Sequence, residues 1–177
     1  MGFNNIETMV LNAPAHGYGI FPALITAYIA DKWRHCRAWT IVFNAVCLIV
    51  GTCMYSQLPL SQKAARYAGI FLAVGGANAN VPLVMSWAQT SVRGQGKRAV
   101  SAAIIVAWGG VGGILAGVVF MQKEALKYPT GVFFTIGVNA FTAVASVALS
   151  FWFRYQNSRA NRGAVILEGD PTFRYQG

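Results

Sequence analysis

The sequence predicts an all-α membrane protein in which about five hydrophobic helices cross the bilayer. The chain of 177 residues is 55% hydrophobic and only 11% charged, against about 25% charged residues in ordinary soluble domains. Its Lys and Arg residues lie between long uncharged runs, and an uncharged run of more than about 18 residues can cross a bilayer as a helix. We expect a helical bundle over residues 1–153 and a polar tail over residues 154–177.

The first two expected spans come before the middle of the chain. The first run, residues 8–30, ends at a stretch rich in charge that begins with Asp31. Pro22 lies in the middle of this run and predicts a kink, because proline has no N–H to donate to the preceding turn. The second span covers residues 38–55, and a polar connection follows it.

Three further spans complete the expected bundle. Residues 67–92 and 99–122 are uncharged and are separated only by the basic residues of the segment 93–98. Two spans joined by so short a loop must be antiparallel. The fifth span, residues 128–153, ends in an aromatic pair, as is typical of helices at a membrane interface.

The basic residues predict the orientation of the chain in the membrane. If the loop after Asp31, the segment 93–98 and the tail share one side, ten Lys or Arg residues lie there and four lie on the other side. Because basic residues concentrate on the cytoplasmic side, we expect the N-terminus outside and the C-terminus in the cytoplasm, most simply at the plasma membrane. The net charge of +9 is thus explained by basic residues that flank the expected membrane spans, and a basic RNA-binding protein is a remote alternative.

The third span carries polar residues that could line a hydrated cavity. Asn78 lies with Gly75 and Pro82 on one small or polar helical face, and Asn80 lies nearly opposite. Uncharged amides can donate hydrogen bonds to a carboxylate. Both asparagines could instead bond neighbouring helices, as asparagines in membranes often do. The two readings stay open for each residue.

The fourth span contains a glycine repeat. Gly109, Gly113 and Gly117 recur every four residues, which is typical of a groove that admits another helix at close range. Trp108 precedes them and could stack on a flat substrate, although packing is the commoner role of an aromatic residue at helical spacing. The glycines do not fit the spacing of a nucleotide-binding loop.

The remaining candidates for chemistry are few. His16 is the one titratable side chain well inside an uncharged run, so it could relay protons or simply bond a backbone carbonyl. No metal-ligand spacing and no nucleophile with a base and an orienting group are visible. The sequence therefore predicts no enzyme, no metal site and no cofactor.

Several motifs occur in a fixed order along nearly the whole chain. The motifs are Asp31-Lys32-Trp33-Arg34, Pro82-Leu83-Val84-Met85-Ser86-Trp87, Gly94, Lys97-Arg98-Ala99, Gly112-Gly113-Ile114, Ala125, Tyr128, Gly131, Asn157, Arg159, Arg162 and Phe173-Arg174-Tyr175. Together they resemble the C-terminal half of a fungal major facilitator superfamily carrier of the anion:cation symporter family, which includes allantoate and nicotinic acid permeases.

The resemblance implies a role in transport. Such carriers have twelve helices in two halves that move a substrate by alternating access, and this chain matches helices eight to twelve. The resemblance implies a small organic anion such as nicotinate or allantoate as substrate, protons as a candidate coupling ion, and a missing N-terminal half or another subunit as partner. A truncated, transport-incompetent fragment is the alternative. The residues expected at the substrate are Asn78, Asn80, Trp108 and His16, and those expected to form a cytoplasmic gate or latch are Asp31, Lys32 and Arg34.

Overall fold

The computed structural model describes residues 5–33, 36–59, 62–119, 129–163 and 165–176, and all its regular elements there are helices. Four of these helices are long and apolar enough to cross a membrane. The helices are α1 (Asn5–Tyr18), α2 (Ile20–Lys32), α3 (Arg37–Gln57), α4 (Lys63–Thr90), α5 (Gln95–Val119) and α6 (Pro129–Asn161). The four long ones are α3 to α6.

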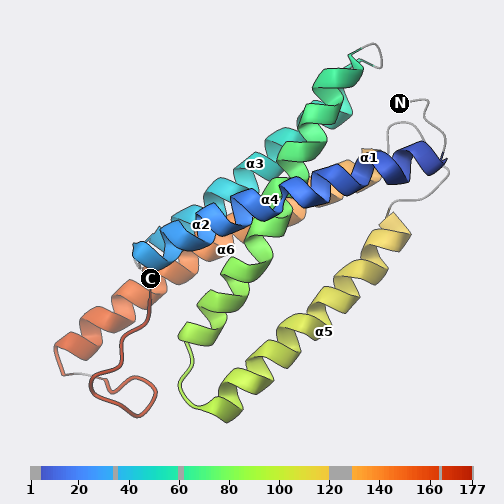
Figure 1. Ribbon diagram of the computed structural model, residues 1–177. Coiled ribbons are helices and arrows are strands. Elements are labelled where there is room, and N and C mark those ends of the chain that lie inside the picture. Colours follow the sequence, from blue (N-terminus) through green and yellow to red (C-terminus); the bar gives the residue numbers. More distant parts are fainter. Residues whose placement is uncertain (1–4, 34–35, 60–61, 120–128, 164, 177) are drawn as a thin grey trace.

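The first expected span is divided into the two short helices α1 and α2. They run nearly end to end and cross α4 (Figure 1). The division falls at Gly19, one turn before Pro22, whose missing N–H leaves the Tyr18 carbonyl without its helical partner. The Gly19 N–H still donates to the Ala15 carbonyl at 3.1 Å. Proline therefore interrupts this span as the sequence indicates, with the break on its N-terminal side.

The centre of the bundle is the pair α3 and α4, which approach so closely that glycine is required between them. A Cβ added at Gly76 would lie 2.5 Å from the Asn44 carbonyl oxygen, and one at Gly51 would lie 2.6 Å from the Gly69 carbonyl oxygen. Both values are far below a van der Waals contact. Small residues thus let the two backbones touch, as is common between membrane helices.

The other helices are arranged around this pair. Helix α6 packs along α3, and Ser146 and Ser150 on α6 are buried. Helix α5 stands apart from the rest (Figure 1) and has no buried residue. It returns from α4 through a short turn in which Gly94 has φ +95°, a backbone conformation that strongly favours glycine.

Several hydroxyl groups within the helices bond to their own backbone. Each of these donates to the carbonyl one turn earlier, so it needs no water in the apolar interior. Thr26, Thr40, Thr52, Thr135, Thr142 and Ser146 do so at 2.7–2.9 Å.

Candidate functional site

The structure brings His16 and Asn78 together at the junction of α1 and α2. The Asn78 amide nitrogen lies 3.5 Å from Nδ1 of His16. Gly19 makes this approach possible, because a Cβ at that position would collide with the Asn78 side chain. One turn away, Gly75 faces Tyr18 and Pro22. The small or polar face of α4 is thus partly covered by the broken first span, and an exposed imidazole and an amide meet there.

Asn80 lies apart from this pair. Its side-chain oxygen is buried without a hydrogen-bond partner, and the same holds for the amide nitrogen of Asn44 on α3. Asn80 is one turn beyond Gly76, which contacts the Asn44 carbonyl. Two amides with unused hydrogen-bonding capacity therefore lie on the facing sides of α3 and α4.

The structure does not bring Trp108 or the regular glycines of α5 to the His16–Asn78 pair. Trp108 is 69% exposed. A Cβ added at Gly109, Gly113 or Gly117 would meet no atom within 4 Å. Whether these residues pack against another helix or face a substrate stays a prediction.

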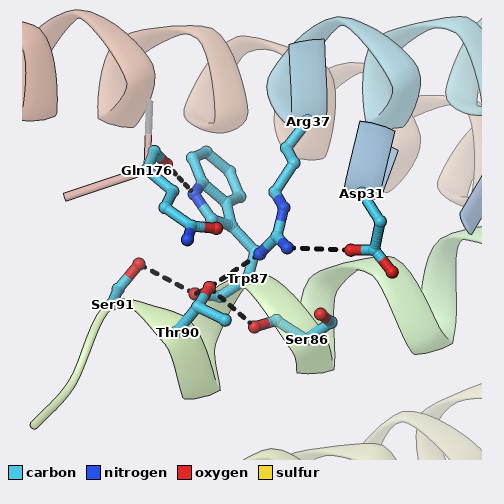
Figure 2. Close-up of polar contacts among 7 residues, drawn as sticks. All are labelled: Asp31, Arg37, Ser86, Trp87, Thr90, Ser91 and Gln176. Atoms are coloured by element: carbon cyan, nitrogen blue, oxygen red, sulfur yellow. Dashed lines mark hydrogen bonds and ion pairs between the residues drawn. The ribbon is translucent and has the colours of Figure 1, made fainter. Parts of the chain in front are cut away.

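Asp31, expected in a gate or latch, forms an ion pair at the end of the bundle where α2 leads into α3. Its carboxylate accepts a hydrogen bond from Nη2 of Arg37 at 3.0 Å, and Nη1 of Arg37 donates to the Thr90 hydroxyl at 2.7 Å (Figure 2). The Thr90 hydroxyl in turn donates to the Ser86 carbonyl at 2.9 Å. Arg37 is only 7% exposed. Its contacts join the end of α2, the start of α3 and the end of α4.

The other expected latch residues take different positions. The Lys32 ammonium lies over the Tyr28 ring, 5.7 Å from its centroid, and Arg34 lies outside the described residues. Sequence reasoning did not single out Arg37 and Thr90 for the latch. They are separated by 53 positions in the chain, and no local pattern indicates their contact.

The tail closes over the same end of the bundle. The indole N–H of Trp87 donates to the Gln176 carbonyl at 2.5 Å (Figure 2). The Asn157 side chain pairs with the Tyr175 backbone, donating at 2.7 Å and accepting at 2.9 Å. The Tyr175 ring stacks on Phe153 with centroids 4.7 Å apart. The tail is too polar to fold alone, and the helices supply the apolar surface on which it is ordered.

Two ion pairs fasten the tail to the basic segment 93–98. The Lys97 ammonium lies 2.7 Å from the Glu168 carboxylate, and Arg93 pairs with Asp170. The hydrogen bond from Lys97 lowers the pKa of the Glu168 carboxyl below its ordinary value of 4.5. The three acidic side chains that the structure describes thus all hold basic groups at this end of the bundle.

We expect acid to loosen the docked tail. Because docking lowers the pKa of Glu168, its stabilising effect is present above pH 4.5 and is lost as the pH falls below that value. Spin labels at Gln95 and Thr172, in a chain without its natural cysteines, should give a narrow distance distribution at pH 7 and a broader one at pH 3. Lys97→Gln should broaden it at pH 7, whereas Lys97→Arg should not. An unchanged distribution at pH 3 would contradict this account.

No group of His, Cys, Asp and Glu in the described segments is placed to hold a metal ion. What the end of the bundle offers is a set of reversible contacts: ion pairs, a buried guanidinium and a stacked tail. What the α1–α2 junction offers is a donor and acceptor pair, the Asn78 amide and the His16 ring. Neither arrangement contains a nucleophile beside a base.

Comparison with known proteins links these features to transport. The chain is 26% identical to the MFS transporter prlL of a fungal species (strain NRRL 50135) over 99% of its own length and 36% of that protein. It is 27% identical to an uncharacterized transporter of Schizosaccharomyces pombe over 97% of its length and 34% of that protein. It is 21% identical to the high-affinity nicotinic acid transporter of Saccharomyces cerevisiae over 90% of its length and 29% of that protein.

These relatives are named as transporters, in agreement with the expectation that the chain is not an enzyme. No family model matches the chain. No solved structure matches it significantly. The chain spans about a third of the length of its curated relatives, as expected from the C-terminal motifs. With its apolar helices, it is an integral membrane protein whose sequence is similar to fungal transporters of the major facilitator superfamily.

Proposed function

We propose that the chain forms part of a carrier that moves small organic anions across the plasma membrane by alternating access. The observation that carries this proposal is the match to fungal transporters along nearly the whole chain. The name of the nicotinic acid transporter among these relatives favours a carboxylate as substrate. Allantoate and related carboxylates are further candidates from the resemblance.

The His16–Asn78 pair supports a polar binding position in this carrier. An amide donates to a carboxylate without carrying a charge, and a histidine can donate or accept according to its protonation. The pair lies where the first span is broken, and broken membrane helices commonly line binding sites. In this proposal, Asn78 holds the anion, and His16 orients it or exchanges a proton that accompanies it.

The contacts at the other end support a gate. Alternating access requires contacts that are made in one state and broken in the other. The Asp31–Arg37–Thr90 network and the docked tail are of this kind, since Asp31 is 72% exposed and can exchange its partner for water. We place this end in the cytoplasm, because ten of the fourteen basic residues flank the spans on this side.

A second candidate is a membrane fragment or helical subunit that transports nothing without a partner. Helix α5 favours it, because no residue of this helix is buried although its composition is strongly apolar. In this case the open glycine ridge at Gly109, Gly113 and Gly117 would receive a helix of another chain.

Uptake of radiolabelled nicotinate separates the two candidates. A yeast strain without its own nicotinic acid transporter would produce this chain alone, or together with the N-terminal part of the S. cerevisiae transporter. We expect saturable uptake above the empty vector in the paired arm. Uptake in the chain-alone arm would show that no partner is needed. Uptake equal to the vector in both arms, with the two parts copurifying, would contradict transport.

Asn78→Leu should reduce this uptake about tenfold, because a buried polar contact to a ligand contributes on the order of 1–3 kcal/mol. The matched control is Asn139→Leu. Asn139 is an asparagine of α6 whose amide already donates to the Thr135 carbonyl at 2.8 Å. Equal uptake by the two variants would mean that Asn78 does not bind the substrate.

A further inference from the structure

A cavity with a partly polar lining lies at the opposite end of the bundle from the docked tail. It has a volume of about 490 Å³, within the range of ligand-binding cavities. The end of α3, the start of α4 and the start of α6 surround it. Its polar lining consists of Arg66, Ser56 and Gln57, and most of the remaining wall is apolar, with Val132 and Phe133 on α6.

Arg66 is the unusual member of this lining. It is only 4% exposed, and its Nε–H is buried without a hydrogen-bond partner. Its guanidinium group lies over the Tyr55 ring, 5.0 Å from the centroid. Stacking of this kind favours one orientation of the guanidinium plane. A buried guanidinium with an unused donor is costly unless an acceptor reaches it.

None of the described carboxylates supplies that acceptor. Asp31, Glu168 and Asp170 all pair with bases at the other end of the bundle. The start of α6 lies in the cavity wall, where Pro129 begins the helix, and a helix N-terminus adds positive potential. The cavity therefore combines an unpaired cation, two neutral polar side chains and an apolar wall.

We propose that this cavity binds a small monocarboxylate with an apolar body, held by the Arg66 guanidinium. The planar fork of arginine matches the two oxygens of a carboxylate, and the apolar wall accommodates the rest of the ligand. The site is separate from the His16–Asn78 pair. Its occupation does not require transport, so it goes beyond the proposed function.

Cys53 provides a direct test, because it is half-buried and lines the same cavity. In the chain with Cys36→Ser and Cys47→Ser, purified in detergent, Cys53 is the one remaining thiol. We would measure its rates of reaction with an anionic and a cationic methanethiosulfonate reagent of similar size. Because the Arg66 guanidinium lines the same cavity as Cys53, it should favour the anionic reagent about tenfold. Arg66→Gln should abolish this preference.

Protection of Cys53 from labelling by added ligands tests whether the cavity binds a carboxylate. Nicotinate should slow the labelling of Cys53 severalfold, and nicotinamide, which has the same ring without the charge, should not. Parallel measurements with phosphate and with chloride test whether any anion protects Cys53 from labelling. Arg66→Lys should keep the charge preference but lose much of the protection, because lysine lacks the planar fork. Arg154→Gln, at an exposed arginine beyond the cavity, is the control and should change neither measurement.

Several results would overturn the proposal. They are an equal preference in the chain with Cys53 alone and in its Arg66→Gln variant, equal protection by nicotinate and nicotinamide, and protection by chloride alone. A preference that emerges only after Glu7→Gln or Glu124→Gln would mean that a carboxylate of the chain itself neutralises Arg66. If Arg66→Gln does not fold, the chain with Cys53 alone and its Arg66→Lys variant still decide the question. Uptake measurements are independent of all these outcomes.

Discussion

Gly76→Ala is expected to lower the free energy of unfolding by about 2 kcal/mol. The added Cβ would lie 2.5 Å from the Asn44 carbonyl oxygen and 3.0 Å from the Leu48 amide nitrogen. Both are backbone atoms of α3, so α3 and α4 must separate. Overpacking of this kind costs roughly 1–3 kcal/mol, and rigid backbone places the cost near the upper limit. The better helix propensity of alanine offsets about 1 kcal/mol.

Gly109→Ala is the matched control, because Gly109 is also in a membrane-length helix but has no atom near its added Cβ. We expect this variant to be unchanged or stabilised by up to about 1 kcal/mol. Both variants would be compared by circular dichroism during unfolding of the detergent-solubilised chain with sodium dodecyl sulfate. If Gly76→Ala were as stable as Gly109→Ala, the close approach of α3 and α4 would be wrong.

Trp87→Ala is expected to cost about 3 kcal/mol or more, the usual range for truncating a buried tryptophan. Trp87 is 5% exposed and meets the Phe153 ring edge-on with centroids 5.7 Å apart. Its indole N–H also holds the Gln176 carbonyl. The substitution should therefore destabilise the bundle and release the tail together. Unfolding in sodium dodecyl sulfate and the spin-label distance from Gln95 to Thr172 would measure the two effects.

Trp108→Ala is the control for Trp87, because Trp108 is 69% exposed on α5. We expect its free energy of unfolding to change by less than about 0.5 kcal/mol. Trp87→Phe separates the two contributions at Trp87, since phenylalanine keeps an aromatic contact but cannot donate to Gln176. A tail that stays docked in Trp87→Ala would show that the ion pairs of Lys97 and Arg93 suffice to hold it.

The helices were predictable because the absence of charge is a strong local signal. Long uncharged runs anticipated α3 to α6, although α6 extends beyond Phe153 to Asn161. That extension carries Arg154 and Arg159, and a helix that has left the hydrocarbon can hold charged residues at little cost. The break at Gly19 was less predictable, because a proline indicates that the helix is interrupted but does not specify at which residue of the preceding turn the helix ends.

The close contacts were not predictable from spacing. Gly109, Gly113 and Gly117 form a regular repeat in the sequence, yet the described part of the chain leaves them open. The actual approach uses Gly51 and Gly76, on different helices, because complementarity depends on the partner surface as well as on the repeat.

The candidate site was predictable in part. Polar residues in an apolar run indicated Asn78 and His16, which do meet. The partner of Asp31 is Arg37, and the tail docks on Trp87. These contacts depend on how distant segments are brought together by packing, which no single stretch of sequence specifies.

The length of α6 has a consequence for where the chain meets water. Its 33 residues correspond to about 50 Å at about 1.5 Å per residue, whereas the hydrocarbon layer is about 30 Å thick. About 20 Å, or two fifths of the helix, must stand clear of the lipid tails unless the helix tilts steeply. With this excess length at the C-terminal end, Asn157, whose side chain pairs with the Tyr175 backbone, would lie in the aqueous layer, and the tail would dock beyond the lipid headgroups.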